Sequence, residues 1–204
     1  MQRHRIFIAI NFPENIKKKL ADYQKKIEEL FTLHQKLRFG AGPVRWTKVN
    51  SLHITLIFLG YITDEELLET CKITKEVAKK YSSFFVNLNE ICYGPVDKKP
   101  PRMVWVLGEK SQEFSDLKDD LEKSLLDSEK INFSPENRKF SPHITLGRIK
   151  QWEWRRIEPE ERPEIKEEIN LNFPVDSIEI MESELKRTGP EYTILESYSL
   201  GSEI

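Results

Sequence analysis

The sequence predicts an α+β protein: two similar lobes of mostly antiparallel sheet with flanking helices, a pseudo-two-fold axis and a central cleft. Two observations support this prediction. Helical and extended segments are interspersed, yet several strands follow one another directly, which favours antiparallel pairing. The tetrapeptide His-Ile-Thr-Leu occurs at 53–56 and again at 143–146. We therefore expect one two-lobed domain over residues 1–204, to which each half contributes one copy of the tetrapeptide.

The chain begins with a strand and an amphipathic helix. Residues 5–12 form an apolar run that ends before Pro13, and this run is typical of a buried strand. Residues 13–31 show apolar side chains at helical spacing, with most lysines on the opposite face. The apolar positions of this helix are Ile16, Leu20, Tyr23, Ile27 and Leu30.

The first tetrapeptide falls in a predicted strand. A loop containing Gly40, Gly42 and Pro43 leads to a short strand at 44–46, and residues 52–60 form a longer strand that we expect to end at Gly60. A second helix is predicted over residues 63–81. Its start is marked by Thr63 and, three residues later, Glu66, which together form a capping box.

Two more strands and a third helix precede the second tetrapeptide. Residues 84–94 and 102–108 are predicted strands on either side of a "KKPP" turn. A helix is expected from Ser111 to about Lys130, since Phe114, Leu117, Leu121 and Leu125 lie on one stripe.

The C-terminal part is predicted to be mostly extended. After a loop at 134–142, residues 143–149 form a strand, and the charged stretch 153–169 is expected to be a solvated connection that is helical in part. Two final strands, at 175–185 and 191–200, flank the turn "KRTGP".

The composition excludes several classes of protein. Charged residues reach 32%, above the ordinary share of roughly 25%, and the excess of lysine and glutamate suggests the hypothesis of a thermophilic source. The net charge of −2 argues against a protein that coats nucleic acid by charge alone, although it permits a small basic cleft. The apolar run near the N-terminus is too short for a signal peptide or a membrane span. We therefore expect a cytoplasmic protein, with Cys71 and Cys92 as small buried residues rather than metal ligands.

The repeated tetrapeptide places polar side chains on one face of each strand. Side chains two residues apart in a strand point the same way, so His53 projects together with Thr55, and His143 projects together with Thr145. The isoleucine and leucine of each copy point into the core. If a pseudo-two-fold axis brings the strands together, the cleft contains two imidazoles and two hydroxyls.

This set of groups suits displacement at phosphorus. One histidine can act as base for the attacking oxygen and the other as acid for the leaving oxygen, while threonine hydroxyls can donate to the non-bridging oxygens. No metal or other cofactor is needed. A two-histidine metal site is the alternative, but neither motif has a nearby carboxylate or cysteine as third ligand. The remaining histidines, His4 and His34, are expected at the surface.

At these motifs the chain resembles the 2H phosphoesterase superfamily, whose members carry two H-x-[ST]-x motifs. It is especially similar to the RNA 2′,3′-cyclic phosphodiesterases, which are also named 2′-5′ RNA ligases. The similar segments are "RIFIAINFP", "VRWTKVNSLHITLIFLG", "PPRMVWVLGE", "RKFSPHITLGRIK" and "SIEIMESELKRTGPEYTILESYSL". The resemblance covers nearly the whole chain, and the charged segment 151–168 is its least familiar part.

The resemblance implies a positively lined cleft between two lobes and hydrolysis of a terminal 2′,3′-cyclic phosphate on RNA to a 2′-phosphate. It assigns His53 as the proton donor to the departing 3′ oxygen and His143 as the proton acceptor that activates water. Thr55 and Thr145 would hold the phosphoryl oxygens. The spacing of the residues does not by itself distinguish the two histidines, because their settings are identical.

Further substrate contacts are weaker predictions. Arg148 is the first candidate for a phosphate contact, but strict alternation places it on the face opposite His143, so a bulge or strand end must turn it inward. Phe7, Tyr192 and Arg102 are further candidates, although a core position is the simpler interpretation of Phe7. Trp152 and Trp154 could stack a base, but partial burial at a lobe edge is the preferred interpretation.

Three functions remain open from the residues. The first is the cyclic phosphodiesterase, acting as a monomer on RNA ends, including tRNA fragments, or on small cyclic nucleotides. The second is a 2′-5′ RNA ligase that joins a cyclic phosphate end to a 5′-hydroxyl. The third is a non-catalytic RNA-end binding module, which would not need two titrating groups and which a bell-shaped pH–rate profile would exclude.

Overall fold

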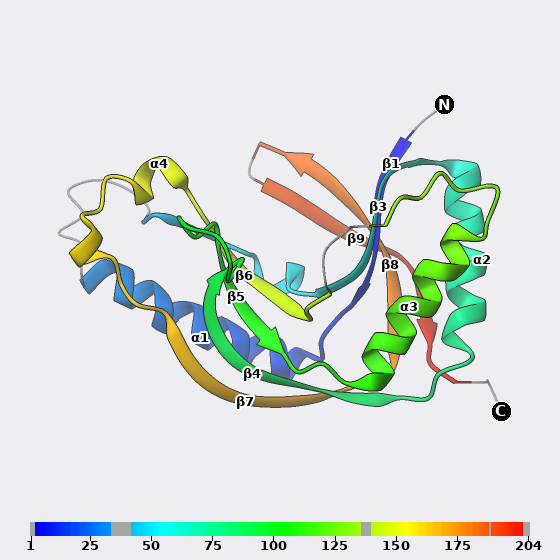
Figure 1. The fold of residues 1–204 in the computed structure, drawn as a ribbon, viewed down its shortest axis with the longest axis horizontal. Coiled ribbons are helices and arrows are strands. Elements are labelled where there is room, and N and C mark those ends of the chain that lie inside the picture. The colour runs from blue at the N-terminus through cyan, green and yellow to red at the C-terminus, as the bar shows by residue number, and fades with distance from the viewer. Residues whose placement is uncertain (1–2, 34–41, 136–139, 188, 202–204) are drawn as a thin grey trace.

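The computed structural model of the protein describes residues 3–33, 42–135, 140–187 and 189–201 (Figure 1). Its helices are α1 (Glu14–Leu33), α2 (Asp64–Ala78), α3 (Gln112–Leu126) and α4 (Gln151–Trp154), with 3₁₀ turns at Val49–Ser51 and Pro159–Glu161. Its strands are β1 (Arg3–Ile10), β2 (Val44–Trp46), β3 (Ile54–Thr63), β4 (Phe84–Gly94), β5 (Met103–Gly108), β6 (His143–Ile149), β7 (Lys166–Val175), β8 (Ser177–Lys186) and β9 (Gly189–Ser199).

The strands of the described residues form one antiparallel sheet in the order β7-β4-β5-β6-β3-β1-β8-β9, and β2 pairs with β6. The sheet has two halves of similar construction, β6-β5-β4-β7 and β3-β1-β8-β9. They meet where β3 and β6 pair through Ile54 and Ile144. The α+β class with mostly antiparallel pairing is confirmed, and the two halves share one sheet.

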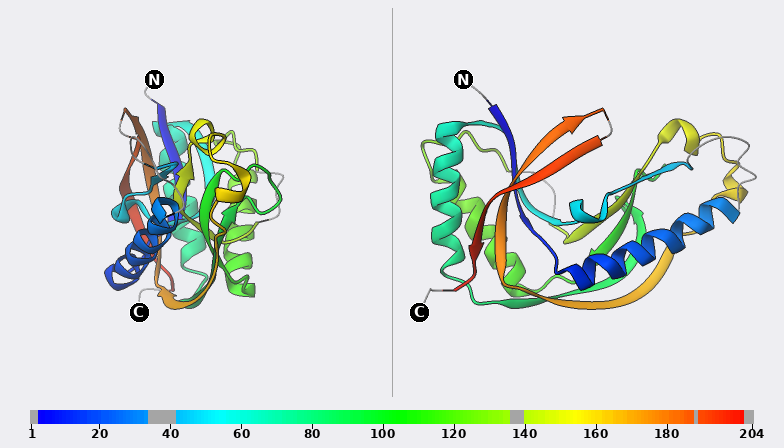
Figure 2. Two further views of the ribbon diagram at one scale, coloured as in Figure 1. Left: turned by 90° about the vertical axis from the view of Figure 1, so that its left-hand side faces the viewer. Right: turned by 180° about the vertical axis from the view of Figure 1, so that it is seen from behind.

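The helices are divided between the halves. α2 and α3 stand side by side against the half that contains β1, β3, β8 and β9, whereas α1 runs along the other half (Figures 1 and 2). The α1 stripe predicted from the sequence is buried, with Ile16, Leu20 and Ile27 at most 2% exposed. No helix in the described part of the chain has the length and apolar character needed to cross a membrane.

Most element boundaries agree with the sequence predictions. The capping box of α2 is present, because the Thr63 hydroxyl accepts from the Glu66 amide and the Glu66 carboxylate accepts from the Thr63 amide. The strand expected to end at Gly60 instead continues to Thr63. Gly60 has φ 79°, a left-handed conformation available to glycine, so the chain passes a bulge opposite β1 and pairing resumes.

One strand is absent from the sequence predictions. The charged stretch 153–169, expected to be a solvated connection, contains α4, a 3₁₀ turn and the first residues of β7. In β7 the apolar residues alternate with polar ones, and Ile169, Leu171, Phe173 and Val175 are at most 8% exposed. This alternation is typical of a half-buried strand. The strand begins within the run of charged residues, which is why its first residues are not recognised from the sequence.

Three residues outside the motifs also differ from expectation. Trp154 is 3% exposed and packs on Tyr93, so it belongs to the core rather than to a lobe edge, whereas Trp152 is 62% exposed. Cys71 and Cys92 are half-buried rather than buried. The predicted positions of His34 and Gly40 lie outside the described residues.

Candidate active site

The junction between β3 and β6 brings the two tetrapeptides together. Ile54 pairs with Ile144, the same position of the repeat, and the strands are antiparallel. Continuing this register by one residue places His53 opposite Thr145 and Thr55 opposite His143. Such an arrangement has a local two-fold axis through the isoleucine pair, which is the symmetry that the repeat predicts.

The two strands share the same irregularity. The pairing register shifts at Leu56 in β3, against β1, and at Leu146 in β6, against β5. Burial follows the same order in both strands: isoleucine buried, threonine half-buried, the next two residues buried, and then an exposed residue. The exposed residues are Phe58 in β3 and Arg148 in β6. Each bulge therefore turns this residue to the face of the histidine and threonine, as the interpretation of Arg148 as a phosphate contact requires.

Each histidine is held through its Nδ1 atom. Nδ1 of His53 lies 2.8 Å from the carbonyl oxygen of Ser51, and Nδ1 of His143 lies 2.8 Å from the carbonyl oxygen of Ser141. A carbonyl can only accept, so Nδ1 carries the proton and Nε2 of the neutral ring carries the lone pair. The two imidazoles thus have the same tautomer. Each is held by the backbone carbonyl of the residue two positions before it in the sequence.

Aromatic rings surround His53. The ring of Phe7 lies 4.9 Å from that of His53, and the edge of Tyr192 lies 5.0 Å from it, centroid to centroid. The pKa of His53 is lowered to about 4, mainly because the ring is buried and also because of the nearby His143 and Arg148 charges, while the Ser51 carbonyl opposes the shift. In the ligand-free protein His53 is therefore neutral near pH 7.

His143 packs against Trp105, with ring centroids 4.0 Å apart. Trp105 in turn lies flat on Gly94, where a Cβ atom would come within 2.1 Å of the indole. The sulfur of Met103 accepts from Trp105 Nε1 at 3.2 Å, and it lies 3.8 Å from Thr145 Oγ1. Since a thioether is a weak acceptor, these donors can turn to a stronger one.

All four motif side chains line a single cavity of about 870 Å³. Arg148, Phe7 and Tyr192 also line it, and Arg148 contacts the Met103 sulfur at 4.0 Å. Arg102 is not among the lining residues and its side chain is exposed. Neither Trp152 nor Trp154 lines the cavity.

Several lining residues escape prediction from the sequence. Arg5, Phe58, Met103 and Trp105 line the cavity beside the motifs. The alternation of β1 places Arg5 on the face of Phe7, which is a usable signal, but Trp105 and Met103 reach the site only through the pairing of β5 with β6.

Gln24 of α1 supports the site from outside the cavity, and nothing in the sequence pattern predicts this role. It is 7% exposed within the apolar stripe. Its Nε2 atom lies 2.8 Å from the carbonyl oxygens of Thr47 and of Leu146, the residue at the β6 bulge. α1 therefore holds the bulge that orients Arg148.

In the described residues, no three His, Cys, Asp or Glu side chains gather as metal ligands would. The absence of a metal requirement stays a prediction. The polar groups that line the cavity include imidazoles, hydroxyls and guanidinium groups, together with two lysines and two acidic residues. Such a set is suited to bind an anion and to exchange protons with it.

Comparisons with known proteins identify the family of this chain. The family model described as LigT like Phosphoesterase matches residues 10–105 and 108–192. An RNA 2′,3′-cyclic phosphodiesterase of Thermus thermophilus is 30% identical over 205 aligned residues, covering 98% of this chain and 91% of the relative. The protein of the same name from Thermotoga maritima is 29% identical over 194 residues, covering 94% and 92%.

Solved structures show the same fold. The crystal structure of TT0787 of Thermus thermophilus has a TM-score of 0.77 and 29% identity, covering 98% of this chain and all of that chain (100%). The structure of E. coli LigT complexed with 3′-AMP has a TM-score of 0.73 at 22% identity, covering 98% and 100%.

Proposed function

The chain belongs to the LigT-like phosphoesterase family, and on that premise we propose that it hydrolyses the 2′,3′-cyclic phosphodiester end of RNA to a 2′-phosphomonoester. It would thus be a hydrolase acting on phosphoric diesters. One observation supports this most directly: the β3–β6 junction sets two identically tethered imidazoles and two threonines on one cavity. A cyclic diester needs a proton taken on one side of phosphorus and given on the other.

In the proposed reaction His143 acts as proton acceptor. Its Nε2 lone pair takes a proton from water, whose oxygen forms a bond to phosphorus. The bond from phosphorus to the 3′ oxygen breaks, and His53 Nε2–H gives that oxygen its proton. One water is consumed, and the products are a 2′-phosphate and a 3′-hydroxyl.

The low pKa of His53, about 4 without ligand, bears on its role as donor. A neutral imidazole cannot donate from Nε2 while Nδ1 holds the proton. The negative charge of a bound cyclic phosphate favours the imidazolium and therefore raises the pKa of His53. In this proposal His53 takes up its proton as the substrate binds.

The remaining polar groups stabilise the charge on phosphorus. Thr55 and Thr145 donate hydroxyl hydrogens to the non-bridging oxygens, and Arg148 supplies positive charge beside them. The donors of Thr145 and Arg148 now face the weak acceptor Met103 Sδ. Phosphoryl oxygens accept more strongly, so the donors are already oriented for the anion before it arrives.

The test uses a short RNA with a 2′,3′-cyclic phosphate, incubated with the full chain in the presence of a chelator. We expect conversion to the 2′-phosphate, and we expect His53→Ala and His143→Ala each to lower kcat by about 10²–10⁴-fold. The position of the product phosphate is read by phosphorus NMR. His4→Ala serves as the matched control, because His4 lies on β1 and does not line the cavity.

The outcomes are distinct. Full activity of either active-site variant would refute the two-histidine mechanism, and loss of activity in chelator would refute the metal-free reaction. No conversion by folded wild-type protein would refute the phosphodiesterase assignment. Ligation of the cyclic end to a 5′-hydroxyl RNA would then be assayed with the same variants.

A further inference from the structure

Arg5 lies in the cavity beside the reacting groups but outside the motifs. It is half-buried on β1, and it lines the same cavity as the motif side chains. Phe7 is two residues further along the same face of β1 and packs on His53. Two residues of a strand span about 6.6 Å. Phe7 therefore lies next to His53, and Arg5 lies about that much further from His53 along the strand.

The guanidinium of Arg5 is held from two sides. Its Nη1 atom donates to the Ser183 hydroxyl at 2.7 Å, and its Cζ atom lies 4.7 Å from the centroid of the Phe58 ring. Ser183 itself is only 4% exposed. A guanidinium stacked on a ring and hydrogen-bonded by one nitrogen keeps a fixed orientation, while its other N–H groups remain donors.

Arg5 also keeps its charge uncompensated. Among the residues that the structure describes, no carboxylate lies within ion-pair distance of Arg5. Lys48, by contrast, lies 3.5 Å from Glu191, and Lys118 is paired with Glu122. Among the described residues, the lysines that line the cavity are thus paired with carboxylates, whereas the guanidinium groups of Arg5, Arg45 and Arg148 are not. Of these three arginines, Arg5 is the one that lies on the strand of Phe7, beside His53.

The position of Phe58 explains why a cation is held at this point. Phe58 follows the β3 bulge where Arg148 follows the β6 bulge, so the two residues occupy equivalent sites of the two halves. In one half the cation is on the motif strand itself. In the other half the motif strand supplies the aromatic platform and the neighbouring strand supplies the cation. The two guanidinium groups thus flank the reacting centre from opposite halves.

We propose that Arg5 binds the phosphodiester that joins the terminal nucleotide to the rest of the RNA, so that it selects RNA ends over free cyclic mononucleotides. The proposal rests on the proposed function. There His53 protonates the departing 3′ oxygen, which places the terminal ribose on the side of Phe7 and Tyr192. The 5′ oxygen of that ribose carries the next phosphate, one nucleotide from the reacting phosphorus.

The experiment compares two substrates that differ in this phosphate. One is a nucleoside 2′,3′-cyclic monophosphate with a 5′-hydroxyl, and the other is a dinucleotide with the same terminal nucleoside and cyclic phosphate. We expect Arg5→Gln to raise KM for the dinucleotide by about 10- to 100-fold, the range for a lost charged hydrogen bond. We expect kcat for the dinucleotide, and both constants for the mononucleotide, to stay near the wild-type values.

Two further variants sharpen the comparison. Arg5→Lys keeps the positive charge but loses the planar guanidinium group. Its KM for the dinucleotide should therefore lie between those of the wild type and Arg5→Gln. Arg3→Gln is the matched control, since Arg3 is exposed on the same strand and does not line the cavity. The slope of log KM against log salt for the dinucleotide should fall by about 0.7 in Arg5→Gln and not in Arg3→Gln.

Other outcomes would overturn the inference. An equal rise of KM for both substrates would place Arg5 on the reacting phosphate, and no rise for either would make it a structural residue. If wild-type protein hydrolyses neither substrate, the proposed function fails separately. The inference is then tested by measuring, by calorimetry, the affinities for the dinucleotide 2′-phosphate and for the nucleoside 2′-phosphate. Arg5→Gln must weaken the affinity for the dinucleotide product more than the affinity for the nucleoside product.

Discussion

At the scale of single residues, two chemically identical histidines lie in different surroundings. Both are tethered through Nδ1 to a carbonyl oxygen. His53 is enclosed by Phe7 and Tyr192, whereas His143 packs against Trp105. The neighbouring strands therefore supply the asymmetry that the repeated tetrapeptide lacks, and a reaction that needs one acid and one base can use it.

The pH dependence tests the assigned roles. The bell-shaped rate profile of the wild type should lose its descending limb at high pH in His53→Ala, because the donor must be protonated. It should lose its ascending limb at low pH in His143→Ala, because the acceptor must be deprotonated. The descending limb should lie at higher pH in kcat than in kcat/KM, since the bound anion raises the pKa of His53 from about 4. The opposite pattern of lost limbs would exchange the roles.

At the scale of elements, bulges and buried polar contacts position the site. Strict alternation would point the Arg148 side chain away from the face of His143. The register shift at Leu146 turns this side chain to the same face as His143. That bulge leaves the Leu146 carbonyl to accept from the Thr47 amide and from Gln24 Nε2, both at 2.8 Å. A helix that contributes no residue to the cavity thus fixes the strand that does.

We expect Gln24→Leu to lower the free energy of unfolding by about 1–3 kcal/mol, since buried carbonyls lose a donor. Relaxation of the bulge should also raise KM for the cyclic phosphate, because Arg148 loses its orientation. Urea denaturation and steady-state kinetics measure the two effects. Gln112→Leu is the control, since Gln112 is exposed on α3 and bonds only Asp116 among the described residues. Equal effects of both substitutions would show that the position of Gln24 is not special.

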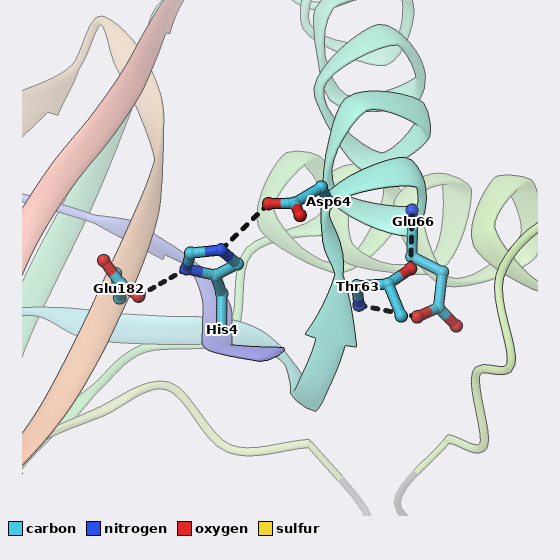
Figure 3. A network of polar contacts seen from close by, with 5 residues as sticks. All are labelled: His4, Thr63, Asp64, Glu66 and Glu182. Carbon is cyan, nitrogen blue, oxygen red and sulfur yellow. Dashed lines mark hydrogen bonds and ion pairs between the residues drawn. The ribbon is translucent and has the colours of Figure 1, made fainter. Parts of the chain in front are cut away.

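His4, which the sequence predicts at the surface, fixes the N-terminal end of β1. His4 Nδ1 lies 2.7 Å from Glu182 on β8, and His4 Nε2 lies 3.0 Å from Asp64 at the start of α2 (Figure 3). Only an imidazolium can donate from both nitrogens. The bond with Glu182 is the main cause that raises the pKa of His4, the Asp64 carboxylate adds to it, and partial desolvation opposes it.

Because the folded-state pKa of His4 is raised, its contribution to stability is fully present below the unfolded value of about 6.5. The contribution is lost as pH rises through the folded-state pKa. We expect His4→Gln to lower the free energy of unfolding by up to about 1 kcal/mol at pH 5.5, and by less at pH 8.5. Chemical denaturation at the two pH values measures this. A loss that is larger at pH 8.5 would contradict the assignment.

At the scale of the whole molecule, the two halves are similar in construction but not separable. One sheet runs through both, and one hydrophobic core contains residues of both, including Ile8 of β1 and Val104 of β5. The cavity lies at their junction, so its geometry depends on both halves being folded. We therefore propose that the chain is a single two-lobed domain.

This proposal predicts a single unfolding transition. The four tryptophans lie on β2, β5 and α4, in the half that contains β6. Fluorescence therefore reports that half alone, whereas far-ultraviolet circular dichroism reports both. The two denaturation curves should coincide. If the curves separate, the halves are independent domains.

The sequence by itself determined the two histidine motifs, the α+β class and most of the helices and strands. These features are local patterns, which can be recognised in the sequence without knowledge of the fold. They are the repeated tetrapeptide, the capping box of α2 and the periodic spacing of apolar residues in most strands and helices. The tertiary structure alone decided which residues complete the site. Trp105 and Met103 reach it, and Gln24 supports it from outside the cavity, through pairing or packing between segments far apart in the chain. Such contacts produce no periodic pattern in the sequence. They depend on the register between strands, which is fixed only when the whole sheet has formed and its apolar face is buried.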